Sequence, residues 1–154
     1  MGATGAERFA AATAHLELSP QRMPDSTHTA AEAAAAVGCE VGAIVKSLVF
    51  LADGVPVLAL VCGDNRADLD RLGAALDAEM TKADARAVKT ATGYSIGGVP
   101  PIGHPEPVPT ILDEDLLRFE TVWSAAGDAQ SVFPASPRDL LTWSRGTLAA
   151  IGAR

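Results

Sequence analysis

Basic residues are scarce in this chain of 154 residues, which carries 12 Lys and Arg against 19 Asp and Glu, a formal charge of −7. A protein that grips nucleic acid through many phosphates needs several clustered cations, because its affinity comes from displacing counterions. The composition therefore excludes a broad nucleic-acid-binding surface and argues against a DNA partner. Contact with one nucleic-acid end stays open, because a few basic groups suffice for it.

Cysteine and histidine are scarce as well, and neither forms a metal-binding pattern. The two cysteines, Cys39 and Cys62, lie in apolar settings without a CxxC pair, which is typical of small core residues. The histidines, at positions 15, 28 and 104, are dispersed without HExxH or similar spacing. We expect a site without metal and without cofactor.

The sequence also has no long apolar run at its start. Residues 1–18 include Glu7, Arg8 and His15 and lack a continuous apolar core, which argues against both a signal peptide and a membrane span. A cytoplasmic protein without a membrane partner is the expectation.

Helical and strand patterns alternate along the chain without an internal repeat or a long linker, which predicts one α/β unit. The expected helices cover residues 5–18, 30–37, 68–78 and 84–92 and a last one beginning at Pro137. The expected strands cover residues 44–51, 55–62, 108–112, 121–125 and 131–134. The first two strands are separated by Ala52-Asp53-Gly54, which favours a hairpin.

One of these strands, IVKSLVFL, holds a single charge at Lys46. Alternation places Lys46 on one face and Ser47 on the other, and both faces are otherwise apolar, so the strand is expected to be central and covered on both sides. An ammonium there loses hydration unless an anion or hydrogen-bond acceptors compensate. Lys46 either extends past an edge into water or forms the floor of a pocket.

A second feature is the loop GGVPPIGH at residues 97–104. Glycines allow a ligand to approach the backbone closely, and prolines reduce the entropy cost of ordering a loop. The same composition also suits a rigid connector. Nucleotide hydrolysis has no support, because neither a P-loop nor a GxGxxG unit is present.

Taken in order, the motifs THTAAEAA (27–34), IVKSLVF (44–50), TGYSIGGVPPIGH (92–104), Asp113 and VWSAAG (122–127) resemble the YbaK/EbsC-type aminoacyl-tRNA deacylases. These are free-standing relatives of the editing domain of bacterial prolyl-tRNA synthetases. The resemblance implies one compact domain over residues 1–154, α/β, with a mixed, largely antiparallel sheet flanked by helices. It also implies hydrolysis of the ester that joins a mischarged amino acid to tRNA.

Applied residue by residue, the resemblance assigns the catalytic role to Lys46. Substrate-binding positions implied by it are Met23, Thr29, Gly97, Gly98, Val99, Pro100, Pro101, Gly103, His104, Ser124 and Gly127. The implied partner is a tRNA acceptor end carrying an aminoacyl group, and an aminoacyl-tRNA synthetase is a second candidate partner. A surface loop position is the alternative for His104.

Ester hydrolysis needs a nucleophile, stabilisation of the oxyanion and a proton for the leaving hydroxyl. A Ser-His-Asp triad is not indicated, because Ser47 points away from the face of Lys46 and no GxSxG elbow occurs. We therefore expect Lys46 to hold the ester carbonyl or the terminal phosphate, with water or a ribose hydroxyl as the nucleophile. A binding module without turnover and a small-molecule hydrolase are the other candidates.

Departures from the family pattern bear on the substrate. Pro100 stands where relatives of the Cys-tRNA type often have a small hydroxyl residue, Met23 stands near their tyrosine, and Ser131 near an acidic residue. Cys-tRNA specificity therefore does not carry over. A small, weakly polar aminoacyl group such as Ala, Ser or Thr is expected, with modest discrimination.

Two further groups concern contact with RNA. Trp123 and Trp143 are expected to pack in the core rather than to stack on bases. The basic residues that could touch the acceptor end are Arg22, Arg66, Arg71, Lys82, Arg86 and Lys89, which the sequence cannot place on one face.

Overall fold

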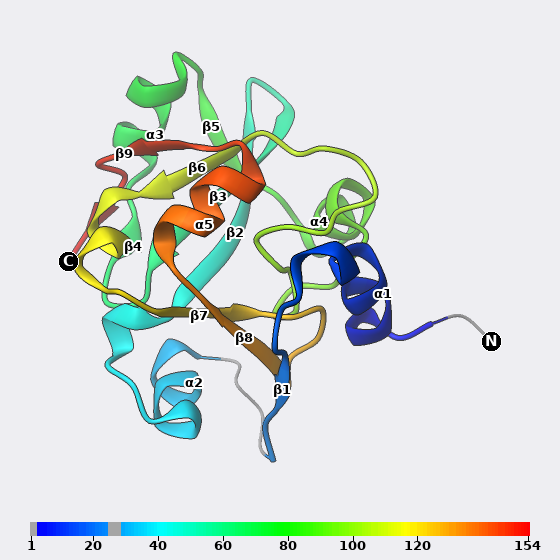
Figure 1. Ribbon diagram of the computed structural model, residues 1–154. Coiled ribbons are helices and arrows are strands. Elements are labelled where there is room, and N and C mark those ends of the chain that lie inside the picture. Colours follow the sequence, from blue (N-terminus) through cyan, green and yellow to red (C-terminus); the bar gives the residue numbers. More distant parts are fainter. Residues whose placement is uncertain (1–2, 25–28) are drawn as a thin grey trace.

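The computed structural model describes residues 3–24 and 29–154 (Figure 1). Thr27 and His28, the first residues of the motif at 27–34, lie outside the described residues. The helices are α1 (Gly5–Ala12), α2 (Ala30–Val37), α3 (Leu69–Leu76), α4 (Ala85–Thr92) and α5 (Pro137–Ser144). Short 3₁₀ segments are η1 (Ala14–Leu16), η2 (Val41–Ala43) and η3 (Glu114–Arg118). The strands are β1 (Gln21–Arg22), β2 (Val45–Ala52), β3 (Val55–Cys62), β4 (Arg66–Ala67), β5 (Met80–Lys82), β6 (Thr110–Asp113), β7 (Val122–Ala125), β8 (Ser131–Ala135), β9 (Thr147–Ala149) and β10 (Gly152–Ala153).

Capping residues set the ends of the helices. The Thr29 hydroxyl accepts from the backbone N–H of Glu32 at 3.0 Å and begins α2, which ends at Gly38 with φ 79°. The first helix is shorter than expected, because α1 stops at Ala12 and Glu17 adopts a left-handed conformation before Pro20 is reached. None of the helices in the described ranges is long and apolar enough to cross a membrane.

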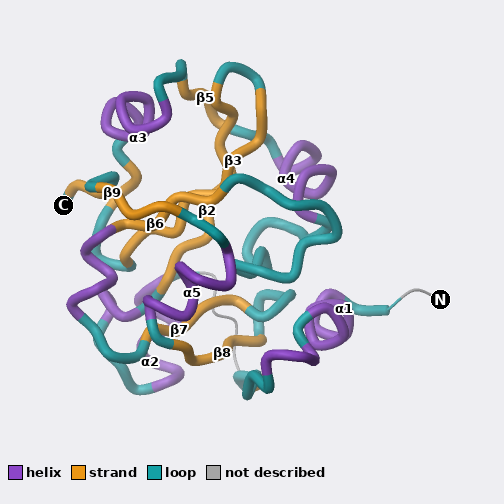
Figure 2. The backbone as a smooth tube through the Cα atoms, turned by 45° about the horizontal axis from the view of Figure 1, so that its top comes forward, coloured by secondary structure: helices purple, strands orange, loops and turns teal. Residues whose placement is uncertain are grey.

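The strands form three sheets rather than one (Figures 1 and 2). The largest has the order β5-β2-β3-β6-β9, with β5, β2 and β3 antiparallel and β3, β6 and β9 parallel. A three-stranded antiparallel sheet has the order β1-β8-β7, and β10 pairs with β4. The mixed α/β class is confirmed. The division into three sheets was not predicted, because β7 and β8 were expected as strands but the pairing of strands far apart in sequence is not a local property, and β1, β4 and β10 have only two residues each.

The hairpin of β2 and β3 is confirmed, with Val45 opposite Cys62 and Ala52 opposite Val55. Asp53 and Gly54 both have positive φ, 49° and 83°, as a two-residue hairpin turn with the right-handed twist of its strands requires.

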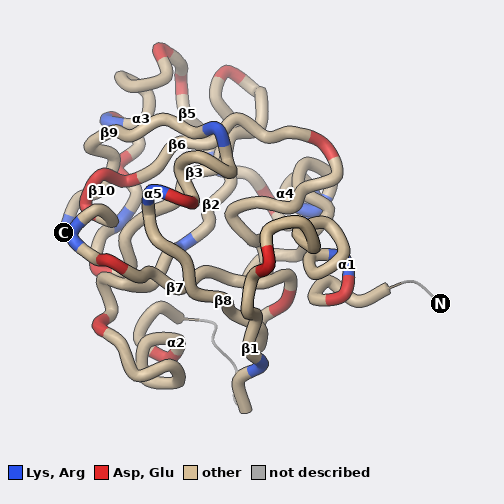
Figure 3. Tube along the Cα trace, viewed as in Figure 1, with Lys and Arg blue, Asp and Glu red and all other residues tan. Residues whose placement is uncertain are grey.

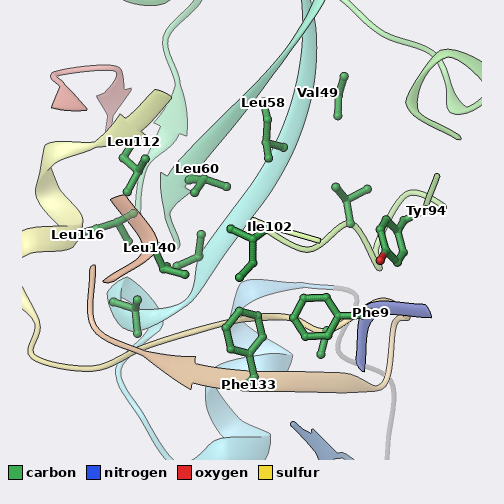
Figure 4. Packing of buried hydrophobic residues seen from close by; sticks show 14 of the residues in the cluster. Phe9, Val49, Leu58, Leu60, Tyr94, Ile102, Leu112, Leu116, Phe133 and Leu140 are labelled. Carbon is green, nitrogen blue, oxygen red and sulfur yellow. The ribbon is translucent and has the colours of Figure 1, made fainter. Parts of the chain in front are cut away.

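The main core lies between the five-stranded and the three-stranded sheets (Figure 4). Leu58 and Leu60 of β3 belong to it, and the rings of Phe9 and Phe133 pack with their centroids 5.1 Å apart. The opposite face of β3 contributes Ala59 and its neighbours to a second cluster, which α3 covers. Strand β3 is thus buried on both faces.

Strand β2 is only partly central, which corrects the expectation for it. It pairs with β5 from Phe50 to Ala52 alone, so no β5 partner accompanies residues 45–49 on that edge. At its start, Ile44 instead forms a parallel bridge with Trp123 at β7. The edge of β2 that carries Lys46 therefore lies open between the two larger sheets.

Candidate active site

A cleft of about 430 Å³ borders the open edge of β2. Its walls come from α2, from the first half of β2, from the loop after α4 and from the facing strands β7 and β8. The lining residues are Thr29, Ala30, Ala33, Ile44, Val45, Lys46, Ser47, Leu48, Ile96, Gly97, Val99, Trp123, Ser124, Ala125 and Val132. Most are apolar, and the polar groups gather on β2, β7 and the start of α2.

Lys46 is half-buried in this lining, and its ammonium Nζ donates a hydrogen bond to the backbone carbonyl of Asn65. Burial lowers the pKa of Lys46 from its ordinary value, because desolvation disfavours the charged amine. The carboxyl groups of Asp64 and Asp113 act in the opposite direction and favour the charge. The ammonium is therefore held at a cleft wall, with part of its hydration replaced by one carbonyl.

The carbonyl that receives Lys46 belongs to a turn fixed by a buried carboxylate. Asn65 Nδ2 donates to Asp113 Oδ2 at 2.8 Å and to Asp115 Oδ2 at 2.7 Å. Asp113, which is 1% exposed, also accepts from the backbone N–H of Cys62 at 3.1 Å. The position of the Lys46 ammonium thus depends on hydrogen bonds that connect the end of β3 with the end of β6.

Two serine hydroxyls in the cleft have no hydrogen-bond partner among the described residues. They are Ser47 Oγ on β2 and Ser124 Oγ on β7, and the whole Ser124 residue is only 2% exposed. A buried hydroxyl without a partner costs free energy, so such groups are unusual unless a ligand or water completes them. Both oxygens are themselves buried, so a polar group bound in the cleft would meet them only after the serine side chains rotate toward it.

Ser47 is a site residue that the sequence reasoning set aside. It lies on the strand face opposite to Lys46, as alternation predicts, yet both side chains line the same cleft. The cleft runs along the edge of β2 rather than over one face, so side chains of both faces border it. Trp123, expected in the core, is half-buried and also lines the cleft.

The glycine-proline loop is divided between two environments. Gly97 and Val99 line the cleft. Gly98 packs instead on the turn after β7, where an added Cβ would come within 2.6 Å of the Cα of Asp128. Pro100 is buried and does not line the cleft.

The end of this loop borders a different hollow. Pro101, Gly103 and His104 line a second depression of about 400 Å³ together with Trp143 and Arg145. His104 Nε2 donates to the carbonyl of Pro100 at 2.8 Å, and burial lowers the pKa of His104, so its ring is neutral near pH 7. Pro101, Gly103 and His104 do not line the cleft that holds Lys46. Their role in substrate binding stays a prediction.

Three other candidates stand differently toward the cleft. Thr29 lines it, although its hydroxyl serves the cap of α2. Met23 is buried outside the lining, and its backbone N–H donates to the carbonyl of Gln130. Gly127 packs against Gly5, where a Cβ would meet the Gly5 carbonyl oxygen at 2.3 Å. Of the candidate set, the structure brings together Lys46, Thr29, Gly97, Val99 and Ser124.

Among residues 3–24 and 29–154, no His, Asp, Glu or Cys side chain lines the cleft. Across the part of the chain that the structure describes, no group of three or more such residues is arranged to hold a metal ion. A half-buried ammonium and two unpartnered hydroxyls in an apolar cleft can bind and polarise a carbonyl or an ester. Because none of the described lining residues is a His, Asp or Glu that could activate a serine, we expect the nucleophile to be water or a group of the bound molecule.

Comparison with protein-family models matches residues 24–143 to the aminoacyl-tRNA editing domain. The chain is 32% identical over 120 residues to the uncharacterized protein YwhH of Bacillus subtilis, covering 77% of this chain and 76% of that protein. It is 30% identical over 127 residues to the "Putative Cys-tRNA(Pro)/Cys-tRNA(Cys) deacylase EbsC" of Enterococcus faecalis, covering 80% and 77% of the two chains.

Among solved structures, the chain is similar to one described as "a putative trans-editing enzyme for prolyl tRNA synthetase". The TM-score is 0.92 at 40% identity, and the match covers 100% of both chains.

Proposed function

Because the chain belongs to the aminoacyl-tRNA editing domain family, we propose that it is a trans-editing deacylase that cleaves the ester between a small amino acid and the terminal adenosine of tRNA. The observation that carries this proposal is the half-buried Lys46 at the wall of an apolar cleft whose lining includes two serines with buried, unpartnered hydroxyls. The products are the free amino acid and intact tRNA.

Lys46 supplies electrostatic stabilisation in this reaction. Its ammonium holds the ester carbonyl, or the terminal phosphate, and stabilises the negative charge that develops on oxygen when the ester is attacked. Water attacks the carbonyl carbon, with the neighbouring ribose hydroxyl as a proton relay; the bond between the carbonyl carbon and the ribose oxygen breaks, that oxygen takes up the proton of the water, and the amino acid leaves as the free acid. The apolar walls reduce competition from bulk water and strengthen this interaction.

The cleft favours a small, weakly polar aminoacyl group, with Ala, Ser and Thr as candidates. Most of its lining residues are apolar, and Ser47 and Ser124 lie among them as partners for a short polar side chain. The printed name of the Enterococcus relative points to cysteine, which is also small. An apolar pocket separates such groups by only about 1–3 kcal/mol per methylene, so we expect several substrates.

The test is release of amino acid from a panel of aminoacyl-tRNAs by the wild type and by Lys46→Ala. The wild type should release small amino acids, and Lys46→Ala should be slower by a factor of about 10² to 10³, as for loss of one oxyanion donor. Arg138→Ala, which removes a cation from the exposed surface of α5, should keep the wild-type rate. Hydrolysis by Lys46→Ala at the wild-type rate would remove the lysine from the scheme.

A binding module of the same fold is the second candidate, favoured by a cleft whose described lining residues include no His, Asp, Glu or Cys. Such a module would bind a tRNA end or a synthetase without turnover. Binding of aminoacyl-tRNA without release of any amino acid from the panel would support it against the hydrolase.

A further inference from the structure

Two cations converge on one backbone carbonyl at the start of the loop that forms a wall of the cleft. Arg8 Nη1 from α1 and Lys89 Nζ from α4 both donate to the carbonyl oxygen of Gly93. Both nitrogens lie within 3.2 Å of that oxygen, so they are separated by at most twice that distance. Like charges so close repel each other, and a single neutral carbonyl compensates for little of that repulsion.

Neither cation forms an ion pair with a carboxylate among residues 3–24 and 29–154. The ion pairs there join Arg22 with Asp128, Arg71 with Asp68, and Arg118 and Arg154 with Asp64. The acids on the same two helices serve as caps, since Glu7 accepts from the Thr4 backbone N–H and Asp84 from that of Ala87. Lys89 is exposed, whereas Arg8 is half-buried with its guanidinium carbon 5.0 Å from the centroid of the Tyr94 ring, so the partners of both among the described residues are neutral groups.

A third cation extends the same surface. Arg86 is exposed on α4 three residues before Lys89, a spacing that places both side chains on neighbouring positions of one helix face. Arg86 also takes part in none of the ion pairs of the described residues. Figure 3 shows the basic segments of α1 and α4 on the same side of the molecule. We call Arg8, Arg86 and Lys89 the Gly93 cation patch.

The Gly93 cation patch lies close to the cleft. Ile96 lines the cleft and is 61% exposed. It follows Gly93 by three residues, and three residues of chain span at most about 11 Å. A nucleotide strand whose terminal ester lies in the cleft carries its preceding phosphates within that range. Arg and Lys side chains are the usual partners of phosphate oxygens and fix the position of a strand without reading its sequence.

We propose that the Gly93 cation patch binds backbone phosphates of the tRNA acceptor strand and so holds the aminoacylated end in the cleft. This inference rests on the proposed function, because it takes the cleft as the place of the ester. It also explains how an acidic protein can bind tRNA, since a few cations beside the site replace a broad basic surface.

The test measures binding of an uncharged tRNA at several salt concentrations by fluorescence anisotropy. The variant is Arg86→Gln with Lys89→Gln, in which the glutamine at 89 can still donate toward Gly93 while the charge is lost. We expect affinity to fall about tenfold and the slope of log affinity against log salt to become shallower by about 2. Arg138→Gln, the same change on the distant helix α5, should match the wild type in both.

Equal affinity and equal salt slope for the double variant and the wild type would overturn the inference. A second measurement uses hydrolysis of an aminoacyl-adenosine, which lacks the preceding phosphates. If the double variant loses as much activity on this short ester as on aminoacyl-tRNA, the side chains act on the cleft and the inference is also wrong. Failure of the wild type to hydrolyse any ester would overturn the proposed function instead, while the binding result would still decide the cation patch.

Discussion

At the scale of the residue, Lys46 places a charge, for which we propose a role in catalysis, where burial is unfavourable to it. Its ammonium is half-buried beside apolar side chains, with the Asn65 carbonyl as its hydrogen-bond acceptor. Burial lowers its pKa, which means that the folded state disfavours the charged amine relative to the unfolded state. We infer that Lys46 lowers the stability of the folded protein and that this loss is tolerated because the proposed site needs its charge.

This cost can be measured with Lys46→Met, which keeps the length of the side chain and removes the charge. At pH values below the lowered pKa, Lys46 is charged in both states and the folded wild type carries the full cost of burying that charge. At pH 7 the free energy of unfolding of Lys46→Met should therefore equal or exceed that of the wild type. As pH rises from the lowered pKa toward 10.5, the unfolded wild type binds more protons than the folded one, and its stability rises. Urea unfolding of both proteins at pH 7 and near pH 10 should show that the difference in free energy of unfolding in favour of Lys46→Met becomes smaller at the higher pH. A difference that grows with pH would contradict this prediction.

The two unpartnered hydroxyls allow a second prediction at this scale. Ser47→Ala and Ser124→Ala remove no hydrogen bond of the described residues, so each should change the free energy of unfolding by less than about 0.5 kcal/mol. Each should lower kcat/KM for aminoacyl-tRNA by about tenfold if its hydroxyl binds substrate. Urea unfolding and deacylation rates measure the two effects.

Thr92→Val is the control, because its buried hydroxyl donates to the Val88 carbonyl and accepts from the Tyr94 backbone N–H. It should lose about 1–3 kcal/mol of stability. A similar loss in either serine variant would show that the hydroxyl has a structural partner.

At the scale of the element, the glycine-proline loop both lines the cleft and packs against the turn that follows β7. Only Gly97 and Val99 reach the cleft, while Gly98 allows the loop to pack on the turn that follows β7. The two roles follow from a turn, since Gly97 has a positive φ of 92° and the Gly98 N–H donates to the Ser95 carbonyl at 3.0 Å, so the chain changes direction between Gly97 and Gly98.

Gly98→Ala should therefore act through packing. Its Cβ would lie 2.6 Å from the Cα of Asp128, which is backbone and cannot rotate away. We expect a loss of about 1–3 kcal/mol in the free energy of unfolding. Ser95→Ala, at an exposed position of the same loop, should stay within about 0.5 kcal/mol of the wild type. Lost activity with unchanged stability in Gly98→Ala would instead place Gly98 against the substrate.

At the scale of the whole molecule, the buried carboxylate of Asp113 connects the sheets and the site. From the end of β6 it accepts from the backbone of Cys62 in β3, from Asn65 and, through Oδ1, from the backbone N–H of Asp115. Gly152 of β10 lies against the same carboxylate, since a Cβ there would meet Asp113 Oδ2 at 2.6 Å. The five-stranded and two-stranded sheets thus meet at the turn that receives Lys46.

Asp113→Ala should destabilise the protein by about 3 kcal/mol or more, because several hydrogen bonds to a buried charged group are lost together and their donors stay buried. Asp115→Ala, which removes a side-chain acceptor of Asn65 from a half-buried position, should cost about 1 kcal/mol. Urea unfolding compares the two. Similar small losses in both would show that Asp113 does not hold the sheets together.

Much of the local structure follows from the sequence. Asp68 and Asp84 begin α3 and α4, Gly38 and Gly93 end α2 and α4, and the β2–β3 hairpin forms around Asp53-Gly54. These features depend on residues close in sequence, whose hydrogen bonds and φ preferences are decided within one turn. The sequence also singled out Lys46, because a charge in an apolar strand is unfavourable in any fold.

The chain by itself thus determined the helix ends, the hairpin, the α/β class and the singular place of Lys46, all through interactions between near neighbours. Only the tertiary structure decided that β5 leaves the edge of β2 open, that Ser47 and Trp123 share the cleft with Lys46, and that Pro101, Gly103 and His104 border another hollow. Those outcomes depend on which sheet edge lies against which loop. Such contacts join residues far apart in sequence, and local conformational preferences do not determine them.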